Sequence, residues 1–86
     1  MRLAPEEDGG ASGTMDMATR VRVARQRAGM TQSQLAERIG VSRGAVANWE
    51  VSERPKPRAS HLVDVAITTD VSIEWLATGR GGIALS

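Results

Sequence analysis

Two short helical patterns joined by one tight turn constrain this chain more than any other feature of its sequence. Thr31 opens the first pattern and forms a T-x-x-Q capping box with Gln34. The apolar positions of this pattern are Leu35, Ala36 and Ile39. Gly40 ends the pattern, because glycine readily takes the left-handed conformation that closes a helix. Ser42 then caps a second helix, predicted over Arg43–Val51. A connection of about three residues makes the two helices cross rather than continue in line.

The small and apolar residues around this turn are spaced for a crossing of about 90–120°. Such a crossing needs a small residue where the helices meet, here Ala36, and a permissive backbone at the turn, here Gly40. It also needs apolar side chains on the second helix, and these are Val46 and Trp49. The side chains left on the exposed face are Arg43, Gly44, Ala47 and Asn48. The pattern from Gln32 to Trp49 therefore predicts a helix-turn-helix.

Three further helices flank this motif. The first runs from a cap at Asp16 to a stop at Gly29. Its apolar positions are Met17, Val21, Ala24 and Ala28. Residues 52–58 contain two prolines and predict a loop, and residues 59–68 predict a helix. The last helix opens at Ser72 and stops at Gly79. It is expected to bury Ile73, Trp75 and Leu76.

The sequence thus predicts an all-α domain of five short helices over residues 16–79, with the helix-turn-helix as helices 2 and 3. Residues 1–15 are acidic and rich in glycine, and they are expected to form a flexible tail, because they offer little apolar surface to offset the entropy of ordering. Residues 80–86 are expected as a carboxy-terminal tail. Translation from Met15 or Met17, and membership of a longer repressor, both remain open.

The net charge of +1 hides a strong asymmetry along the chain. Residues 1–18 carry a net charge of −3, residues 19–58 carry +6, and residues 59–86 carry −2. Eight of the nine bases in the middle segment are arginine, whose planar guanidinium suits phosphate oxygens and guanine edges. A nucleic-acid partner would explain this charge pattern, and a solvated surface compensated by nearby acids would explain it equally well.

Composition excludes several other classes of protein. The chain contains no cysteine, which rules out disulfides and thiolate metal sites, and its single histidine cannot build a zinc site alone. No apolar run approaches the roughly 20 residues of a membrane span, so a cytoplasmic protein is expected. No constellation of catalytic residues is present. We therefore predict neither an enzyme nor a cofactor or metal.

These motifs resemble the Cro and phage-repressor-like helix-turn-helix domains, also called the XRE family. The resemblance runs from about Thr19 to Gly79. It rests on TRVRVARQRAGMTQSQLAERIGVSRGAVANWE, on Pro57 followed five residues later by Leu62, and on DVSIEWLATG. It implies a lambda-repressor-like fold in which the second helix of the motif enters the DNA major groove. One departure is Ser52, which stands where the family usually has glycine.

The resemblance implies roles for individual residues. The residues toward the bases would be Arg43, Gly44, Ala47 and Asn48, with Arg43 as a bidentate donor to guanine. Those toward phosphates would be Gln32, Ser42, Arg54, Lys56 and Arg58, with Arg20 as a further candidate. Arg25 and Glu50 correspond to a pair that forms an internal salt bridge in relatives. The candidates for a dimer interface are Ile73, Leu76 and Leu85.

Two functions from different classes follow. The first is a transcriptional regulator of phage or mobile-element type that binds a two-fold-related operator in double-stranded DNA as a homodimer. The second is an antitoxin-like module whose main contact is another protein, for which Ile83 and Leu85 would supply apolar contacts.

Overall fold

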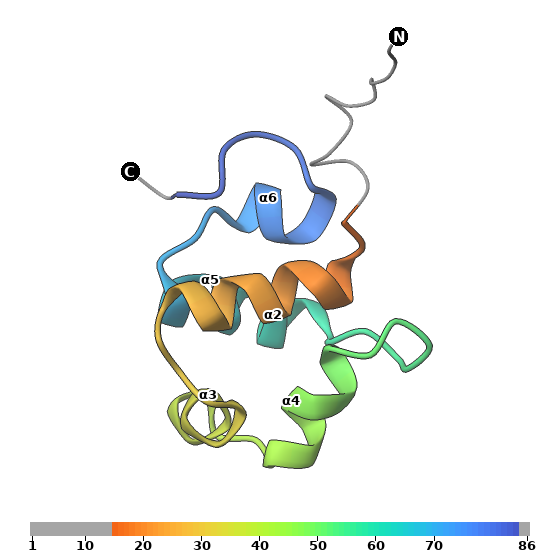
Figure 1. The fold of residues 1–86 in the computed structure, drawn as a ribbon, viewed down its shortest axis with the longest axis vertical. Helices are drawn as coiled ribbons and strands as arrows, with labels where there is room; N and C mark the ends of the chain where they lie inside the picture. Colours follow the sequence, from red (N-terminus) through yellow and green to blue (C-terminus); the bar gives the residue numbers. More distant parts are fainter. Residues whose placement is uncertain (1–14, 85–86) are drawn as a thin grey trace, which may run out of the picture.

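The computed structural model describes residues 15–84 and contains five helices (Figure 1). They are α2 (Met17–Arg27), α3 (Gln32–Ile39), α4 (Arg43–Trp49), α5 (Ala59–Thr69) and α6 (Ile73–Thr78). The two long helices α2 and α5 pack together in the middle of the molecule, with α6 on one side and α3 and α4 on the other. The five-helix prediction is thereby confirmed. The expected acidic tail, apart from Met15, lies outside the described residues.

The helix ends follow the capping residues that the sequence indicates. Thr31 and Gln34 form the reciprocal capping box, with the Gln34 N–H donating to Thr31 Oγ1 at 3.1 Å and the Thr31 N–H donating to Gln34 Oε1 at 2.9 Å. Ser42 Oγ accepts from the Ala45 N–H at 3.0 Å. Gly40 has φ +90°, a value that side-chain-bearing residues rarely adopt, and so lets the chain reverse between α3 and α4.

One predicted helix boundary is wrong, because α4 ends at Trp49 rather than Val51. The N–H groups of Glu50 and Val51 donate to carbonyls three residues back, at 3.2 and 3.1 Å. The helix therefore ends in a tighter turn with 3₁₀-type hydrogen bonds. Val51 is exposed to 43%, which means that continuing the helix would bury no further apolar surface there.

The core lies where all five helices meet. Its largest fully buried side chains are Val21, Leu35, Val46, Val65, Val71 and Leu76. Trp49 and Trp75 are exposed to only 8% and 3%, which confirms that both are core residues. Ile73 was expected to be buried and is not, since 42% of it is exposed. It is the first residue of α6 and points outward while Trp75 and Leu76 point inward.

The segment after α6 folds back over the α5–α6 junction. Val71 and Ala84 form an isolated antiparallel bridge, and the Ser72 N–H donates to the Ile83 carbonyl at 2.8 Å. Ile83 packs against the core, which corrects the expectation that it offers a free apolar contact to a partner. None of the described helices is long and apolar enough to cross a membrane.

Candidate nucleic-acid interface

α3 and α4 cross at the turn around Gly40 and pack through small and apolar residues. Ala36 is 3% exposed at the contact, which leaves no room for a larger side chain there without displacing the helices. On α4, Val46 and Trp49 point inward, and the Trp49 ring lies 5.4 Å from the His61 ring of α5. This packing fixes which face of α4 is turned outward.

The outward face of α4 carries all four residues expected to meet bases. Arg43, Gly44 and Asn48 are exposed and Ala47 is half-buried. A Cβ added at Gly44 would meet nothing closer than Ser42 Oγ at 3.8 Å, so the fold itself does not require glycine at this position. The assignment of these four residues to bases stays a prediction. Their common face is the geometry that the assignment needs.

A polar network fixes both ends of α4 to α2 and α3. The Arg25 guanidinium of α2 donates through Nε to Glu50 Oε2 at 2.6 Å and through Nη2 to Glu50 Oε1 at 2.9 Å. Arg25 Nη1 also donates to the Met30 carbonyl at 2.8 Å. Gln32 Nε2 donates to Glu50 Oε1 at 3.1 Å, and Arg43 Nη1 donates to Gln32 Oε1 at 3.3 Å.

The ion pair of Arg25 and Glu50 is the internal salt bridge that the family resemblance implies. Its side chains are exposed to 13% and 4%, so solvent screens the pair poorly. The hydrogen bonding of the Arg25 guanidinium to the Glu50 carboxylate is the main cause that raises the pKa of Arg25 above its ordinary value. Removing either partner would leave a buried, uncompensated charge, and the pair takes one arginine out of the positive surface.

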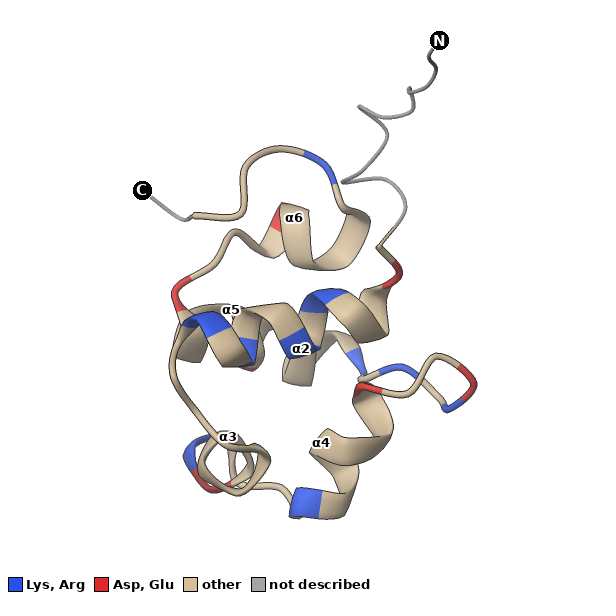
Figure 2. Ribbon diagram, in the orientation of Figure 1, with Lys and Arg blue, Asp and Glu red and all other residues tan. Residues whose placement is uncertain are grey.

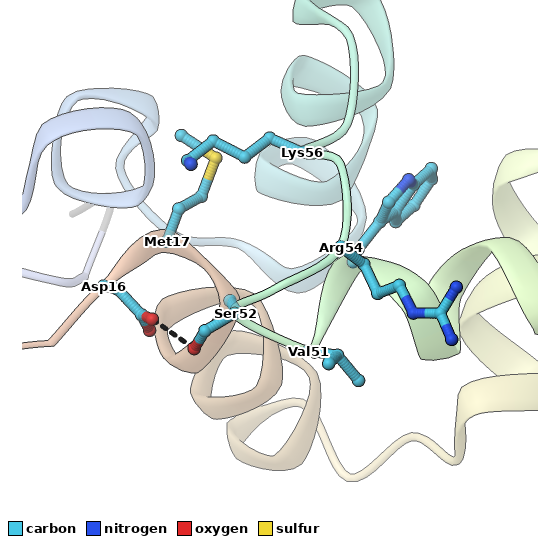
Figure 3. A pocket seen from close by; sticks show the side chains of 8 residues that line it. Asp16, Met17, Val51, Ser52, Arg54 and Lys56 are labelled. Atoms are coloured by element: carbon cyan, nitrogen blue, oxygen red, sulfur yellow. Dashed lines mark hydrogen bonds between the residues drawn. The ribbon is translucent and has the colours of Figure 1, made fainter.

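The loop after α4 carries the three cations expected to contact phosphates: Arg54, Lys56 and Arg58. All three are exposed, whereas Pro57 between them is buried and fixes the loop to the body of the domain. Arg54 and Lys56 both line one small pocket beside the loop, together with Asp16 and Met17, and Figure 3 shows the Arg54 guanidinium extending away from the Asp16 carboxylate. The side chains are free to reach a ligand, and their contact with phosphates stays a prediction.

Ser52 has a partner that the sequence does not indicate. Its hydroxyl donates to Asp16 Oδ2 (Figure 3). Asp16 Oδ1 accepts from the Thr19 N–H at 3.0 Å. These two hydrogen bonds, the one from Ser52 first, lower the pKa of Asp16 from 3.8 to about 2. Ser52 is also not at positive φ, so the helix ends here without the left-handed turn that a glycine would supply. Serine in place of the family's usual glycine thus comes with a hydrogen bond from the loop to Asp16, the N-cap residue of α2.

Arg20 does not belong to the exposed positive surface, which corrects its assignment as a phosphate candidate. It is 7% exposed, and its Nε donates to the Leu76 carbonyl at 2.9 Å. Its other two nitrogens donate to the Met15 carbonyl and, at 3.3 Å, to the Ala77 carbonyl. The guanidinium therefore caps the carboxyl end of α6 from α2. The remaining basic residues of the described part of the chain lie on α2, on α3, at the start of α4 and in the loop after it, with Arg80 in the segment after α6 (Figure 2).

The three dimer candidates have different positions. Leu76 is fully buried, so it cannot contact a second copy. Leu85 lies outside the described residues. Ile73 lines an apolar groove of about 160 Å³ between α5 and α6, and the other lining residues are Val63, Ala66, Ile67 and Val71. Ile67 is 72% exposed and Val63 44%, which makes this groove an exposed apolar surface separate from α3 and α4.

The sequence and the fold were compared with those of known proteins. Residues 21–76 match the family described as helix-turn-helix. Over 48 residues the chain is 44% identical to an uncharacterised HTH-type transcriptional regulator of Haemophilus influenzae, a match covering 56% of this chain and 20% of that protein. Over 69 residues it is 33% identical to the HTH-type transcriptional regulators for conjugative elements R391 of Providencia rettgeri and SXT of Vibrio cholerae. Those matches cover 80% of this chain and 31% of each relative, so the chain spans less than a third of the curated relatives it matches.

Two solved structures share the arrangement of helices. The P22 c2 repressor, in complex with synthetic operator 9T in the presence of Tl⁺, has a TM-score of 0.70 and 30% sequence identity. The match covers 78% of this chain and all of that chain. SinR, a master regulator for biofilm formation solved in complex with DNA, has a TM-score of 0.65 and 28% identity over 71% of this chain and 97% of its own.

Proposed function

The chain belongs to the helix-turn-helix family, and on that premise we propose that it is a transcriptional regulator that binds operator DNA through α4. The observation that carries the proposal is the outward face of α4, where Arg43, Gly44 and Asn48 are exposed together beside the basic loop. Relatives described as transcriptional regulators for conjugative elements, and a repressor and a regulator solved with DNA, support it. Arg43 donates to guanine O6 and N7, and Asn48 contacts an adenine directly or through water.

The backbone contacts surround this face. Gln32 and Ser42 lie at the amino ends of α3 and α4, where free N–H groups favour phosphate oxygens. Arg54, Lys56 and Arg58 extend the positive surface along the loop. These contacts set the position of α4 on the duplex, while the contacts with bases determine which DNA sequence is bound. Because Gly44 and Ala47 offer few atoms to bases, DNA shape supplies part of the specificity.

Gel-shift titration on the DNA that flanks the protein's own gene tests this function. At about 150 mM salt, binding to that DNA should be at least 1000-fold tighter than binding to a random duplex. The substitution Arg43→Ala should cost about 1–3 kcal/mol and relax the base preference, whereas Lys56→Ala should weaken binding to all sequences alike. Equal affinity of the wild-type protein for flanking and random DNA would refute sequence-specific binding.

The regulator acts as a homodimer on a two-fold-related site, with the groove between α5 and α6 as the contact between copies. One α4 makes few base contacts, so useful affinity requires two half-sites about one helical turn apart. Exposed Ile67 and Ile73 supply apolar surface for a second copy, and α4 stays free when they are covered. The same side chains occur on both copies, as a two-fold contact requires.

Sedimentation of Ile67→Lys tests the dimer, with Gln26→Lys on the exposed surface of α2 as the matched control. The first variant should be monomeric at concentrations where the control and the wild type form dimers, and it should protect half of the footprint. Both variants gain a positive charge, which attracts DNA. Weaker DNA binding by Ile67→Lys alone therefore cannot result from the change in charge. A wild type that is monomeric even on its operator would refute the homodimer, and a stoichiometric second protein that co-purifies from the native host would favour the antitoxin-like alternative.

A further inference from the structure

The first part of the loop after α4 buries few of its own side chains. All the residues from Val51 to Lys56 are exposed, and the next buried side chain is that of Pro57. The Arg54 N–H donates to the Val51 carbonyl at 3.0 Å, which closes a β-turn that has Ser52 as its second residue. Arg54, the first of the loop cations, is the last residue of this turn. Its position therefore depends on how the turn is held against the domain.

One hydrogen bond between side chains joins this turn to the start of α2. The Ser52 hydroxyl donates to Asp16 Oδ2, 36 residues earlier in the chain (Figure 3). A small pocket of about 20 Å³ lies between the turn and the first residues of α2, with room for about one water molecule. The hydrogen bond thus crosses a gap that side-chain packing does not fill. A glycine, which the family usually has at position 52, has no hydroxyl and could not make this contact.

The two carboxylate oxygens of Asp16 have different partners. Oδ1 accepts from the Thr19 N–H at 3.0 Å and so caps α2, while Oδ2 accepts from the hydroxyl of Ser52 in the loop. A serine at position 16 would cap the helix about equally well, but its single oxygen would be used by the cap. The second oxygen of Asp16 is therefore the atom that holds the turn. The Arg54 guanidinium extends away from this carboxylate (Figure 3).

We infer that Asp16 and Ser52 are positioning residues for the loop after α4, whose first turn they hold in one place before any DNA is bound. They fix the backbone that carries Arg54 and Lys56 and leave both cations exposed. A loop that is ordered in advance loses less conformational freedom when its cations bind phosphates. For DNA, this inference rests on the proposed function. For the free protein, it is a statement about the order of one turn.

Backbone ¹⁵N relaxation in the free protein tests the positioning directly. In the wild type, the amides of Glu53 and Arg54 should have order parameters of about 0.85, the value of a rigid backbone. In Ser52→Ala these order parameters should fall below about 0.6. Asp16→Ser should have the same effect, because it keeps the cap of α2 and lacks the second oxygen.

Two further variants control this experiment. Ser52→Thr keeps the hydroxyl and should therefore keep the turn ordered. Ser60→Ala removes a hydroxyl from the exposed surface of α5 and should leave the order parameters of the turn unchanged. If Glu53 and Arg54 are equally mobile in the wild type and in Ser52→Ala, the inference is wrong.

A double-mutant cycle on a random duplex tests the consequence for DNA, because the loop cations are proposed to contact phosphates rather than bases. At about 50 mM salt, Ser52→Ala should weaken binding by about two- to fivefold, and it should do so equally on the DNA that flanks the gene. In a background that carries both Arg54→Ala and Lys56→Ala, the same substitution should change the affinity by less than about 1.5-fold. A loss of equal size in both backgrounds would overturn the inference.

The outcomes of these experiments separate this inference from the proposed function. Thermal unfolding shows whether Ser52→Ala folds, and Asp16→Ser, which breaks the same contact from the side of α2, replaces it in both experiments if it does not. If the wild type binds flanking and random DNA equally, sequence-specific regulation fails, and the cycle on the random duplex still decides the role of Ser52. If the wild type binds no DNA at all, the proposed function fails, and the relaxation experiment still decides whether Asp16 and Ser52 hold the turn.

Discussion

Replacing Arg20 by methionine should destabilise the domain more than replacing any exposed arginine. α6 has only six residues, and the Gly79 N–H donates to the Trp75 carbonyl at 2.7 Å. The next two carbonyls, those of Leu76 and Ala77, have the Arg20 guanidinium as their partner at 2.9 and 3.3 Å. A methionine keeps the apolar stem of the side chain but offers no donor to these carbonyls.

The magnitude follows from the groups left without partners. A buried carbonyl that loses its only donor costs about 1–3 kcal/mol. The favourable interaction of a partly buried cation with a helix carboxyl end, lost at the same time, is worth up to about 2 kcal/mol. The variant no longer buries a charged guanidinium, so its desolvation penalty disappears and offsets part of this loss of stability. The net expectation is a decrease of about 2–4 kcal/mol in the free energy of unfolding.

Thermal and urea unfolding, followed by circular dichroism at 222 nm, measures this difference. For a domain of this size, 1 kcal/mol shifts the melting temperature by about 4–8 °C, so the expected decrease is about 10–25 °C. Arg22→Met, two residues along α2 and exposed, should stay within about 0.5 kcal/mol of the wild type. Arg20→Lys should lie between the two, because an ammonium lacks the fork that reaches several carbonyls. A loss below 1 kcal/mol in Arg20→Met would refute the reasoning.

Three other variants test separate features of the structure. Asp70 has φ +59°, the one positive value among the non-glycine residues described, so Asp70→Gly should raise the free energy of unfolding by about 0.5 kcal/mol in urea denaturation. The hydrogen bond from Ser52 is the largest of the causes that lower the pKa of Asp16 to about 2, so the stability it adds is complete above about pH 4 and is lost as the pH falls toward 2. The gap in melting temperature between the wild type and Ser52→Ala should shrink over that range, and a constant gap between pH 5 and pH 2.5 would contradict this cause. Gly44→Glu should stabilise α4 by about 1 kcal/mol, because it removes a helical glycine and adds an acid to the first turn, yet it should weaken DNA binding more than tenfold in a gel shift.

The features predicted correctly from the sequence depend on residues close together in the chain. The capping box of Thr31 and Gln34 and the turn at Gly40 each involve a few consecutive residues, so local propensity decides them. The inward side of α4 is also local, since Val46 and Trp49 are three residues apart. The outward face, and with it the candidate site, follows directly from that spacing.

The features that were missed depend on distant partners. The sequence predicts a surface position for Arg20, whereas its partner Leu76 lies 56 residues away. A signal was present, because Met17, Arg20, Val21 and Ala24 follow the spacing of a buried helical stripe. No such signal exists for the return of residues 83–84 to Val71, or for the bond between Ser52 and Asp16, because both depend on how α5, α6 and the loop come together.

Two side chains of α2 and that of its N-cap residue fix the helix to three other parts of the molecule. Asp16 holds the loop after α4, Arg20 holds α6, and Arg25 holds Glu50 at the end of α4. In a pair of copies joined at the α5–α6 groove, the separation of the two α4 helices is then set by a body that bends little. One base pair inserted between the half-sites rotates one of them by about 34–36° and moves it by about 3.4 Å. The pair cannot follow that change, so the operator should tolerate substitutions at its centre far better than a change in its length.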